Sequence, residues 1–161
     1  RYFPKKKVIL TGNPIRKAII QSPERQIGKS HHLLVLGGSQ GAKCLNRLVG
    51  MAIQVLWQSG VPLEVVHQTG RLDLSHMEKF YRGADISAKV TPFISDMGGS
   101  YSWADLVVCQ AGAGTLAELT ALGRPSILIP YPSAADGHQE ANAMELADAG
   151  AAKYFREEEI G

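Results

Sequence analysis

The chain has 161 residues, of which 45% are hydrophobic and 20% charged, a composition that fits one globular domain with a full apolar core. Its formal net charge of +2 is too small to indicate a nucleic-acid partner. The two cysteines, Cys44 and Cys109, lack any metal-ligand spacing, which fits a reducing compartment. No stretch reaches the roughly 18 apolar residues of a membrane span. The first residue is Arg1 and no signal peptide follows, so we expect a piece of a longer protein.

Short apolar runs alternate with amphipathic segments along the whole chain. The runs are rich in Val, Ile and Leu and do not alternate with polar residues, which is typical of strands buried on both faces of a parallel sheet. We predict strands at Lys7–Thr11, His32–Leu36, Leu63–His67, Lys89–Thr91, Leu106–Cys109, Ser126–Ile129 and Ala151–Tyr154.

The segments between these runs predict helices at Gly41–Gln58, Thr115–Leu122 and His138–Ala149. Each has apolar residues at helical spacing or a glycine just beyond its end. Strands that alternate with helices predict an α/β fold, a Rossmann-like parallel sheet with helices on both faces. We assign residues 31–161 to this domain and residues 1–30 to an entry segment and interdomain linker.

A glycine-rich turn, Gly37–Gly41, follows the second predicted strand. Ligands of such sheets bind beyond the carboxyl ends of the strands. Glycines let the backbone approach a phosphate, and the next helix offers free N–H groups. The alternative is a tight strand-to-helix turn that needs glycine for its geometry alone. The turn is not a Walker A loop, because no Gly-Lys-Ser/Thr follows.

A second glycine turn lies in the segment Gln110–Glu118. It loosely matches a dinucleotide fingerprint, but no acidic residue ends the next strand, so we reject that interpretation. Glu118 lies one turn into the predicted helix. Its carboxylate is suited to accept hydrogen bonds from two ribose hydroxyls. The alternative is a glutamate that only favours the helix dipole.

Other strand ends carry weaker signals. His138, Gln139 and Asn142 begin a helix after a polar loop; they suit sugar hydroxyls, although capping by Asp136 and neighbouring residues explains them equally well. Asp96 is expected to be a helix N-cap. His67 is expected to be a buried histidine rather than a catalyst.

No Asp-x-Asp pair occurs in the chain, and no spacing indicates a Ser-His-Asp or Cys-His arrangement. The domain is therefore expected to hold an anionic, hydroxylated ligand without a metal or another cofactor.

Seven motifs in order resemble the C-terminal domain of the MurG family of bacterial N-acetylglucosaminyltransferases. They cover nearly the whole chain and lie at Gly12–Arg16, Leu36–Ala42, His67–Gly70, Phe93–Met97, Ala104–Cys109, Gly112–Glu118 and His138–Ala143. The resemblance implies the C-terminal half of a two-domain GT-B glycosyltransferase. Such an enzyme transfers GlcNAc from UDP-GlcNAc to lipid I, with inversion, and gives lipid II for peptidoglycan.

The resemblance also implies a set of UDP-GlcNAc-binding residues. Arg16 and Ser39 would contact the diphosphate region, the backbone of Ile94 would bind uracil, and Glu118 would hold the ribose. His138, Gln139 and Asn142 would read the GlcNAc hydroxyls. The remaining positions belong to the second glycine turn and the helix start: Gln110, Ala113, Gly114, Thr115, Leu116 and Ala117.

The chain departs from the family at two points. Gln110 stands where the family usually has arginine, so a charge near the diphosphate is lost. The acceptor domain, with its lipid I site, membrane contact and expected base, is not part of these 161 residues, nor is the family's C-terminal tail. We therefore expect weak UDP-GlcNAc binding and no turnover by the chain alone. The family's place is the cytoplasmic side of the plasma membrane, as a peripheral enzyme.

Three rival hypotheses remain open. The first is a separate-chain catalytic subunit of a dolichol-pathway GlcNAc-transferase. The second is a domain similar to UDP-GlcNAc 2-epimerase, which would need acid and base residues at the sugar. The third is a nucleotide-binding regulatory domain with no chemistry.

Overall fold

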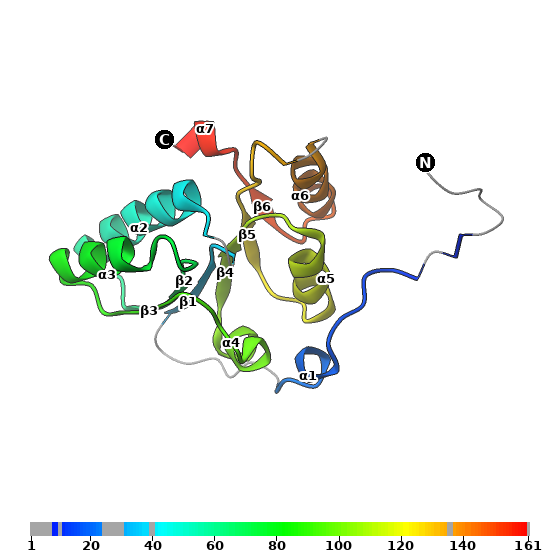
Figure 1. The fold of residues 1–161 in the computed structure, drawn as a ribbon, viewed down its shortest axis with the longest axis horizontal. Helices are drawn as coiled ribbons and strands as arrows, with labels where there is room; N and C mark the ends of the chain where they lie inside the picture. The colour runs from blue at the N-terminus through cyan, green and yellow to red at the C-terminus, as the bar shows by residue number, and fades with distance from the viewer. Residues whose placement is uncertain (1–7, 10, 24–30, 39–40, 135–136, 161) are drawn as a thin grey trace.

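The computed structural model describes residues 8–9, 11–23, 31–38, 41–134 and 137–160. Six parallel strands form one sheet in the order β3-β2-β1-β4-β5-β6 (Figure 1). The predicted parallel α/β fold is therefore confirmed, and each strand lies within two residues of its predicted bounds. The strands are β1 His31–Leu36, β2 Leu63–Gln68, β3 Ala88–Thr91, β4 Leu106–Cys109, β5 Ser126–Leu128 and β6 Lys153–Tyr154.

Helices cover both faces of the sheet, as predicted. On one side α2 and α3 pack together, while α1, α4, α5 and α6 lie on the other side (Figure 1). The predictions found α2, α5 and α6 but gave no bounds for α1, α3, α4 and α7. The helices are α1 Lys17–Ile20, α2 Lys43–Gln58, α3 Leu74–Gly83, α4 Met97–Trp103, α5 Ala113–Ala121, α6 His138–Asp148 and α7 Glu157–Ile160.

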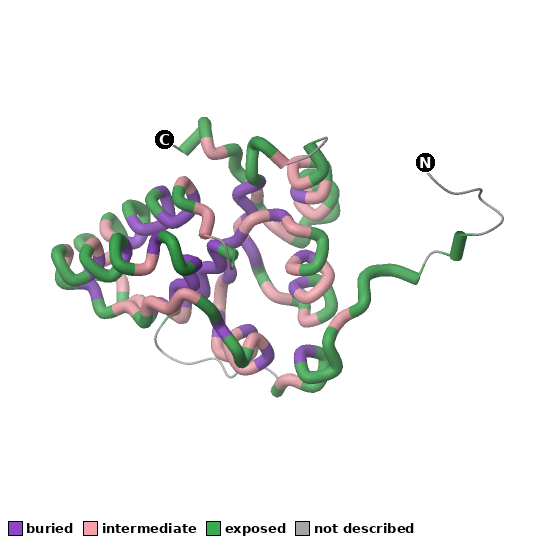
Figure 2. The backbone as a smooth tube through the Cα atoms, in the orientation of Figure 1, coloured by how far each residue is buried: buried purple, intermediate pink, exposed green. Residues whose placement is uncertain are grey.

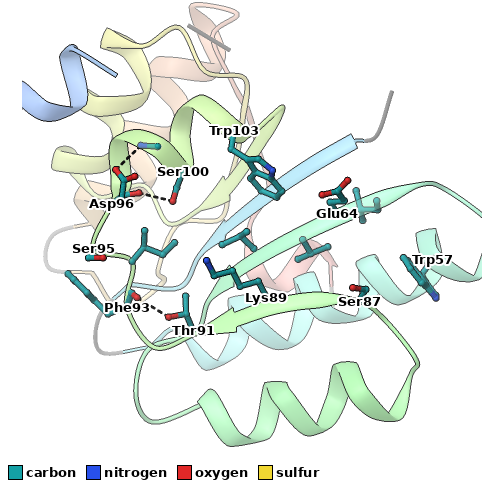
Figure 3. Close-up of a pocket in the computed structure, with 15 residues that line it drawn as sticks. Trp57, Glu64, Ser87, Lys89, Thr91, Phe93, Ser95, Asp96, Ser100 and Trp103 are labelled. Carbon is teal, nitrogen blue, oxygen red and sulfur yellow. Dashed lines mark hydrogen bonds between the residues drawn. The ribbon is translucent and has the colours of Figure 1, made fainter. Parts of the chain in front are cut away.

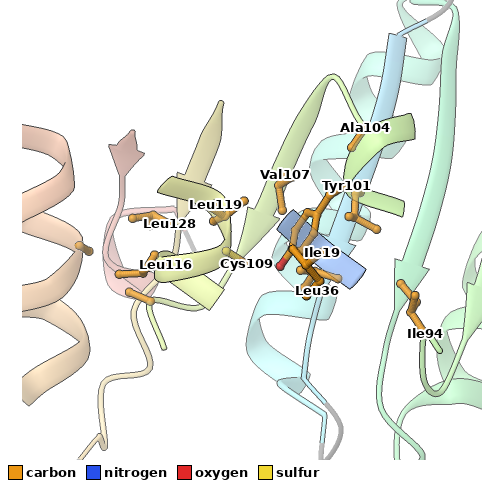
Figure 4. Packing of buried hydrophobic residues seen from close by; sticks show 13 residues of the cluster. Ile19, Leu36, Ile94, Tyr101, Ala104, Val107, Cys109, Leu116, Leu119 and Leu128 are labelled. Carbon is orange, nitrogen blue, oxygen red and sulfur yellow. The ribbon is translucent and has the colours of Figure 1, made fainter. Parts of the chain in front are cut away.

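Two apolar clusters, one on each face, explain why the strands contain unbroken apolar runs. Successive side chains of a strand point to opposite faces. In β1, Leu33 and Val35 therefore join the cluster beneath α2 and α3, while Leu34 and Leu36 join the cluster beneath α4 and α5. Figure 4 shows the second cluster, and Figure 2 shows the buried strands at the centre of the molecule.

The predicted strand at Lys7–Thr11 is wrong for its described residues. Val8, Ile9 and Thr11 lie outside any strand, and Ile9 is 86% exposed. A single apolar run does not make a strand unless a sheet edge is available to pair with it. The expected linker contains helix α1 instead, and its Ile19 is buried in the cluster that also contains residues of α4 and α5.

The neighbouring strands β1 and β4 mark the point where the strand order reverses. The chain leaves β1 into α2 on one face and leaves β4 into α5 on the other face. A crevice between such diverging turns is the usual ligand site of open parallel sheets. In the described ranges, no helix is both long and apolar enough to cross a membrane.

Candidate functional site

A cavity of about 430 Å³ lies at the carboxyl ends of the central strands. Its wall combines residues at or just beyond the ends of β1, β2, β3 and β4 with side chains of α4, α5 and α6. The N-cap residue of α1 completes the wall. This is the place that the topology predicts for a ligand. The lining residues are Arg16, Leu36, Gly38, Gln68, Phe93, Ile94, Met97, Tyr101, Cys109, Gln110, Gly112, Gly114, Thr115, Glu118 and Gln139.

The start of α5 faces this cavity without a capping side chain. Gly112 is the N-cap residue, the first turn contains no acidic residue, and in the described chain no side chain accepts a hydrogen bond there. The first helical bond runs from Leu116 N to Gly112 O. The preceding N–H groups therefore have no partner within the helix, and together with the helix dipole they favour an anion.

Glu118 places a carboxylate in the cavity, one turn beyond these N–H groups. The Tyr101 hydroxyl donates a hydrogen bond to Glu118 Oε2 at 2.9 Å. Arg16 Nη2 lies 3.5 Å from Glu118 Oε1, and the Arg16 side chain is 61% exposed. Because Arg16 is so exposed, this ion pair contributes little to stability. The carboxylate is held from one side and keeps acceptor capacity for a ligand.

Two protonated side chains line the cavity beneath Glu118. Tyr101 is fully buried, and burial, followed by the negative charge of Glu118, raises the pKa of its phenol above the ordinary range. Burial likewise raises the pKa of the Cys109 thiol to about 12. The phenol therefore remains a donor to Glu118, and the thiol is no nucleophile at neutral pH.

The glycine turn after β1 is packed tightly against the protein. A Cβ on Gly37 would clash with Asn46 Oδ1 and would lie 2.9 Å from the Gln68 carbonyl oxygen. Gly41 has a φ of +90°, and its Cβ would lie 2.9 Å from the Thr69 carbonyl oxygen. The need for glycine at these two positions is therefore structural. Ser39, the predicted diphosphate contact in this turn, lies outside the described residues.

Helix α6 contributes to the site mainly through its first turn. Gln139 lines the cavity, and its Oε1 accepts a hydrogen bond from Tyr131 N at 3.0 Å. Asn142 Nδ2 donates to the Ala111 carbonyl oxygen at 3.1 Å, which ties α6 to the turn before α5. His138 is exposed at the start of the helix. Asp136, the expected cap, lies outside the described residues.

The structure brings many, but not all, of the predicted site residues together. Seven line the cavity: Arg16, Ile94, Gln110, Gly114, Thr115, Glu118 and Gln139. Leu116 is buried in the core, its N–H is bonded to the Gly112 carbonyl oxygen, and it does not line the cavity. Four others do not line the cavity in the described chain: Ala113, Ala117, His138 and Asn142.

Two smaller predictions are confirmed. Asp96 is the N-cap of α4, and its Oδ1 accepts a hydrogen bond from Gly99 N at 2.9 Å. His67 is fully buried, with partners on both ring nitrogens, the Tyr81 hydroxyl at 2.8 Å and Asn46 Oδ1 at 3.0 Å.

Sequence reasoning missed Tyr101 and Gln68, among others, as residues of the cavity. Tyr101 is 17 positions away from Glu118, and only the fold, which puts α4 and α5 on the same face of the sheet, brings them together. The apolar spacing of α4 is interrupted by Gly98 and Gly99, so no periodic pattern marked this helix. The position of Gln68 at the end of a predicted strand was the one available signal.

A second cavity, of about 910 Å³, lies on the sheet face beside β2 and β3 (Figure 3). Lys89, Trp103 and Glu64 line it, and Ile94 is shared with the first cavity. It lies along the face of the sheet rather than between the glycine turns, so we do not place the ligand there. Among the described residues, no group of three His, Cys, Asp or Glu side chains is placed to hold a metal ion.

Comparisons with known proteins identify the family. The model of the glycosyltransferase family 28 C-terminal domain matches residues 32–161, which includes both glycine turns and Glu118. Two curated relatives are named UDP-N-acetylglucosamine--N-acetylmuramyl-(pentapeptide) pyrophosphoryl-undecaprenol N-acetylglucosamine transferase. The one from Xylella fastidiosa (strain Temecula1) is 49% identical over 155 residues, which are 93% of this chain and 43% of the relative. The one from Geobacter sulfurreducens is 44% identical over 164 residues, which are 99% of this chain and 45% of the relative.

A solved structure confirms the resemblance to MurG. The crystal structure of Acinetobacter baumannii MurG superposes with a TM-score of 0.79 and 38% identity, covering 89% of this chain and 42% of that one. The chain thus spans less than half the length of these relatives. Since the family model matches most of the chain and the relatives match nearly all of it, the chain belongs to the glycosyltransferase family 28 C-terminal domains.

Proposed function

We propose that this chain is the donor-binding domain of an inverting N-acetylglucosaminyltransferase that holds UDP-GlcNAc in the 430 Å³ cavity. The observation that carries the proposal is the carboxylate of Glu118, which lines the same cavity as the uncapped start of α5. Ribose hydroxyls need an acceptor, and a diphosphate needs fixed N–H donors. The names of the relatives supply the sugar and the nucleotide.

The proposed ligand has an assigned contact for each of its parts. The backbone of Ile94 binds uracil, Glu118 holds the ribose, and Ala113–Thr115 present helix-start amides to the diphosphate. Arg16, which lines the cavity, is assigned to the diphosphate, and Ser39 is assigned to it from the family resemblance alone. Gln139, which lines the cavity, faces the GlcNAc hydroxyls, whereas His138 and Asn142 are assigned to them from the family resemblance alone.

The start of α5 also has a proposed role in the reaction. The bond between the anomeric carbon of GlcNAc and the diphosphate oxygen breaks, and negative charge develops on the departing UDP. Backbone N–H groups that are already fixed stabilise this charge without reorganisation, and one such donor typically contributes about 3–4 kcal/mol. The chain's part in catalysis is therefore to hold the donor sugar and stabilise the leaving group.

The acceptor is proposed from the relatives alone. GlcNAc is transferred to lipid I to give lipid II for peptidoglycan, on the cytoplasmic side of the plasma membrane. The lipid I site, the membrane contact and the general base are assigned to the part of the relatives' length that this chain does not span. Transfer therefore requires that part, and this chain alone is expected to bind without turnover.

A binding experiment tests the donor site. Glu118→Ala removes the carboxylate and should weaken UDP binding by at least about tenfold, since hydrogen bonds to charged groups contribute about 1.5–3 kcal/mol. Glu145→Ala is the matched control, because Glu145 is an exposed glutamate of α6. Calorimetry with UDP should show a loss only for Glu118→Ala. Equal affinities for both variants and the parent would reject the proposed ribose contact.

A chimera tests the transfer reaction. This chain can replace the matching part of the Xylella relative, which is 49% identical to it. Incubated with UDP-GlcNAc and lipid I, the chimera should form lipid II, whereas this chain alone should not. A folded chimera that binds UDP-GlcNAc but epimerises it, or leaves it unchanged, would favour the rival hypotheses.

A further inference from the structure

A buried polar network lies beneath the glycine turn that follows β1. Asn46 in the first turn of α2 and His67 in β2 are both 0% exposed. His67 Nε2 lies 3.0 Å from Asn46 Oδ1, and His67 Nδ1 lies 2.8 Å from the Tyr81 hydroxyl. Because an amide oxygen only accepts, Nε2 carries the proton and Nδ1 accepts from Tyr81.

The Asn46 amide joins α2 to β2 and α3. Its Nδ2 donates to the Thr69 carbonyl oxygen at 3.0 Å and to Asp73 Oδ2 at 2.8 Å. Asp73 is itself only 7% exposed and is the N-cap residue of α3. Both N–H groups and the oxygen of Asn46 therefore have partners, and no other orientation of the amide satisfies them. A fully satisfied network of this kind fixes its elements rigidly, since any change leaves a buried polar group unpaired.

The same groups form the surface against which the glycine turn rests. Gly37 lies against Asn46 Oδ1, and Gly41 lies against the Thr69 carbonyl oxygen. Gly37 N also donates to the Gln68 carbonyl oxygen at 2.8 Å. Gly38 and Gln68, the immediate neighbours of these contacts, line the cavity. A displacement of Asn46 is therefore transmitted to one wall of the ligand cavity.

We propose that Asn46 is a positioning residue for the diphosphate side of the site. It sets where the backbone of Gly37 and Gly38 and the start of α2 stand relative to the ligand, and it does not touch the ligand itself. This inference rests on the proposed function, in which the glycine turn borders the diphosphate while Ile94 and Glu118 bind the uridine. Its specific consequence is that a substitution of Asn46 lowers the affinity for UDP more than the affinity for uridine.

The variant Asn46→Asp tests this consequence. It keeps the size of the side chain but replaces the N–H donor with an oxygen that faces Asp73 and the Thr69 carbonyl oxygen. UDP affinity should fall by about tenfold or more, while uridine affinity should stay within about twofold. Ile53→Val is the matched control, because Ile53 is fully buried in the same helix but belongs to the apolar cluster; it should leave both affinities unchanged.

The exchanged pair, Asn46→Asp with Asp73→Asn, provides a rescue. It restores a donor between the two side chains and leaves only the Thr69 carbonyl oxygen without its amide partner. We expect it to recover at least about threefold of the lost UDP affinity. No recovery would show that the contact between these two side chains does not position the turn.

The outcomes separate this inference from the proposed function. A parent chain that binds neither UDP nor uridine overturns the proposed function. A parent that binds both, together with an Asn46→Asp variant that loses neither or loses both equally, overturns only the role of Asn46. If Asn46→Asp does not fold, Tyr81→Phe removes the donor to His67 more gently. It should lower the affinity for UDP by about threefold and leave the affinity for uridine unchanged. An unchanged affinity for UDP would contradict the inference.

Discussion

The turn after β1 and the turn after β4 both carry glycines into a helix, but these glycines have different surroundings. In the first turn, a Cβ on Gly37 or Gly41 would meet protein atoms at less than 3 Å. In the second turn, a Cβ on Gly112 or Gly114 would meet nothing within 4 Å. Both turns border the same cavity. The protein itself explains the first pair, whereas open space beside the second pair is left for a ligand.

The largest expected effect is on the first turn. Gly37→Ala places a methyl group against Asn46 Oδ1 and the Gln68 carbonyl oxygen, which are held by the buried network and the sheet. Overpacking together with a broken buried hydrogen bond should lower the free energy of unfolding by about 3 kcal/mol or more. Urea denaturation of the parent and variant measures this. An unchanged midpoint would show that Asn46 and the Gln68 carbonyl oxygen do not hold the turn at Gly37.

The second prediction concerns the pH dependence of stability that His67 in the same buried network causes. Burial lowers the pKa of His67 from its ordinary 6.5 to about 3. The unfolded chain therefore takes up a proton as pH falls through 6.5, while the folded chain does not, so stability falls with pH in this window. Between pH 7 and pH 5 this histidine should cost about 2 kcal/mol. Urea midpoints at both pH values, compared with those of His67→Gln, should show a smaller pH dependence for the variant.

The third prediction concerns the second turn, where binding and stability should move in opposite directions. Gly114→Ala fills open space in the cavity and should lower the affinity for UDP by about tenfold. Stability should rise by about 0.5–1 kcal/mol, because alanine is the better helix residue. Gly83→Ala in α3 is the control, since a Cβ there also meets nothing within 4 Å but Gly83 does not line the cavity. A loss of stability in Gly114→Ala would show that Gly114, like Gly37, is needed for the packing of the protein itself.

A smaller effect is expected at the carboxylate beyond the second turn. Tyr101→Phe removes the donor to Glu118 Oε2 and should lower stability by about 1 kcal/mol and uridine affinity by about fivefold. The readouts are urea denaturation and calorimetry with uridine. Uridine affinity equal to that of the parent would show that Tyr101 does not orient the carboxylate for the ribose.

The smallest effect is expected at Gln110, which lines the cavity beside the second turn. Gln110→Arg adds the positive charge that the family resemblance predicts at this position. Because Gln110 is half-buried, one added ion pair should raise the affinity for UDP by about two- to fivefold. Calorimetry at two salt concentrations should show that the gain shrinks as salt rises. A salt-independent gain, or none, would place the side chain away from the diphosphate.

The fold was largely predictable because buried parallel strands leave a plain signal. Unbroken apolar runs such as Leu33–Leu36 follow from a sheet covered on both faces, and α2 is long enough to show its periodicity. Short helices were harder, since the seven residues of α4 include two glycines. The run at residues 7–11 misled because apolar composition does not reveal whether a strand has a partner.

In the candidate site, residues within one turn could be predicted from the sequence, but contacts between distant segments could not. Glycines and Glu118 are visible because they are close in sequence. The contacts of Tyr101 with Glu118 and of Asn46 with His67 and Asp73 join elements that are distant along the chain. Such pairs depend on how helices and strands pack, which composition and spacing do not specify. The different reasons for glycine in the two turns also became apparent only from the surrounding atoms.

The most direct test of the donor site is an NMR titration of this chain with UDP-GlcNAc, and with NAD at the same concentrations. UDP-GlcNAc should shift the amide signals of Ile94 and of Gly112–Glu118, and NAD should leave them unchanged. Shifts of these amides with NAD but not with UDP-GlcNAc would contradict the proposed donor site.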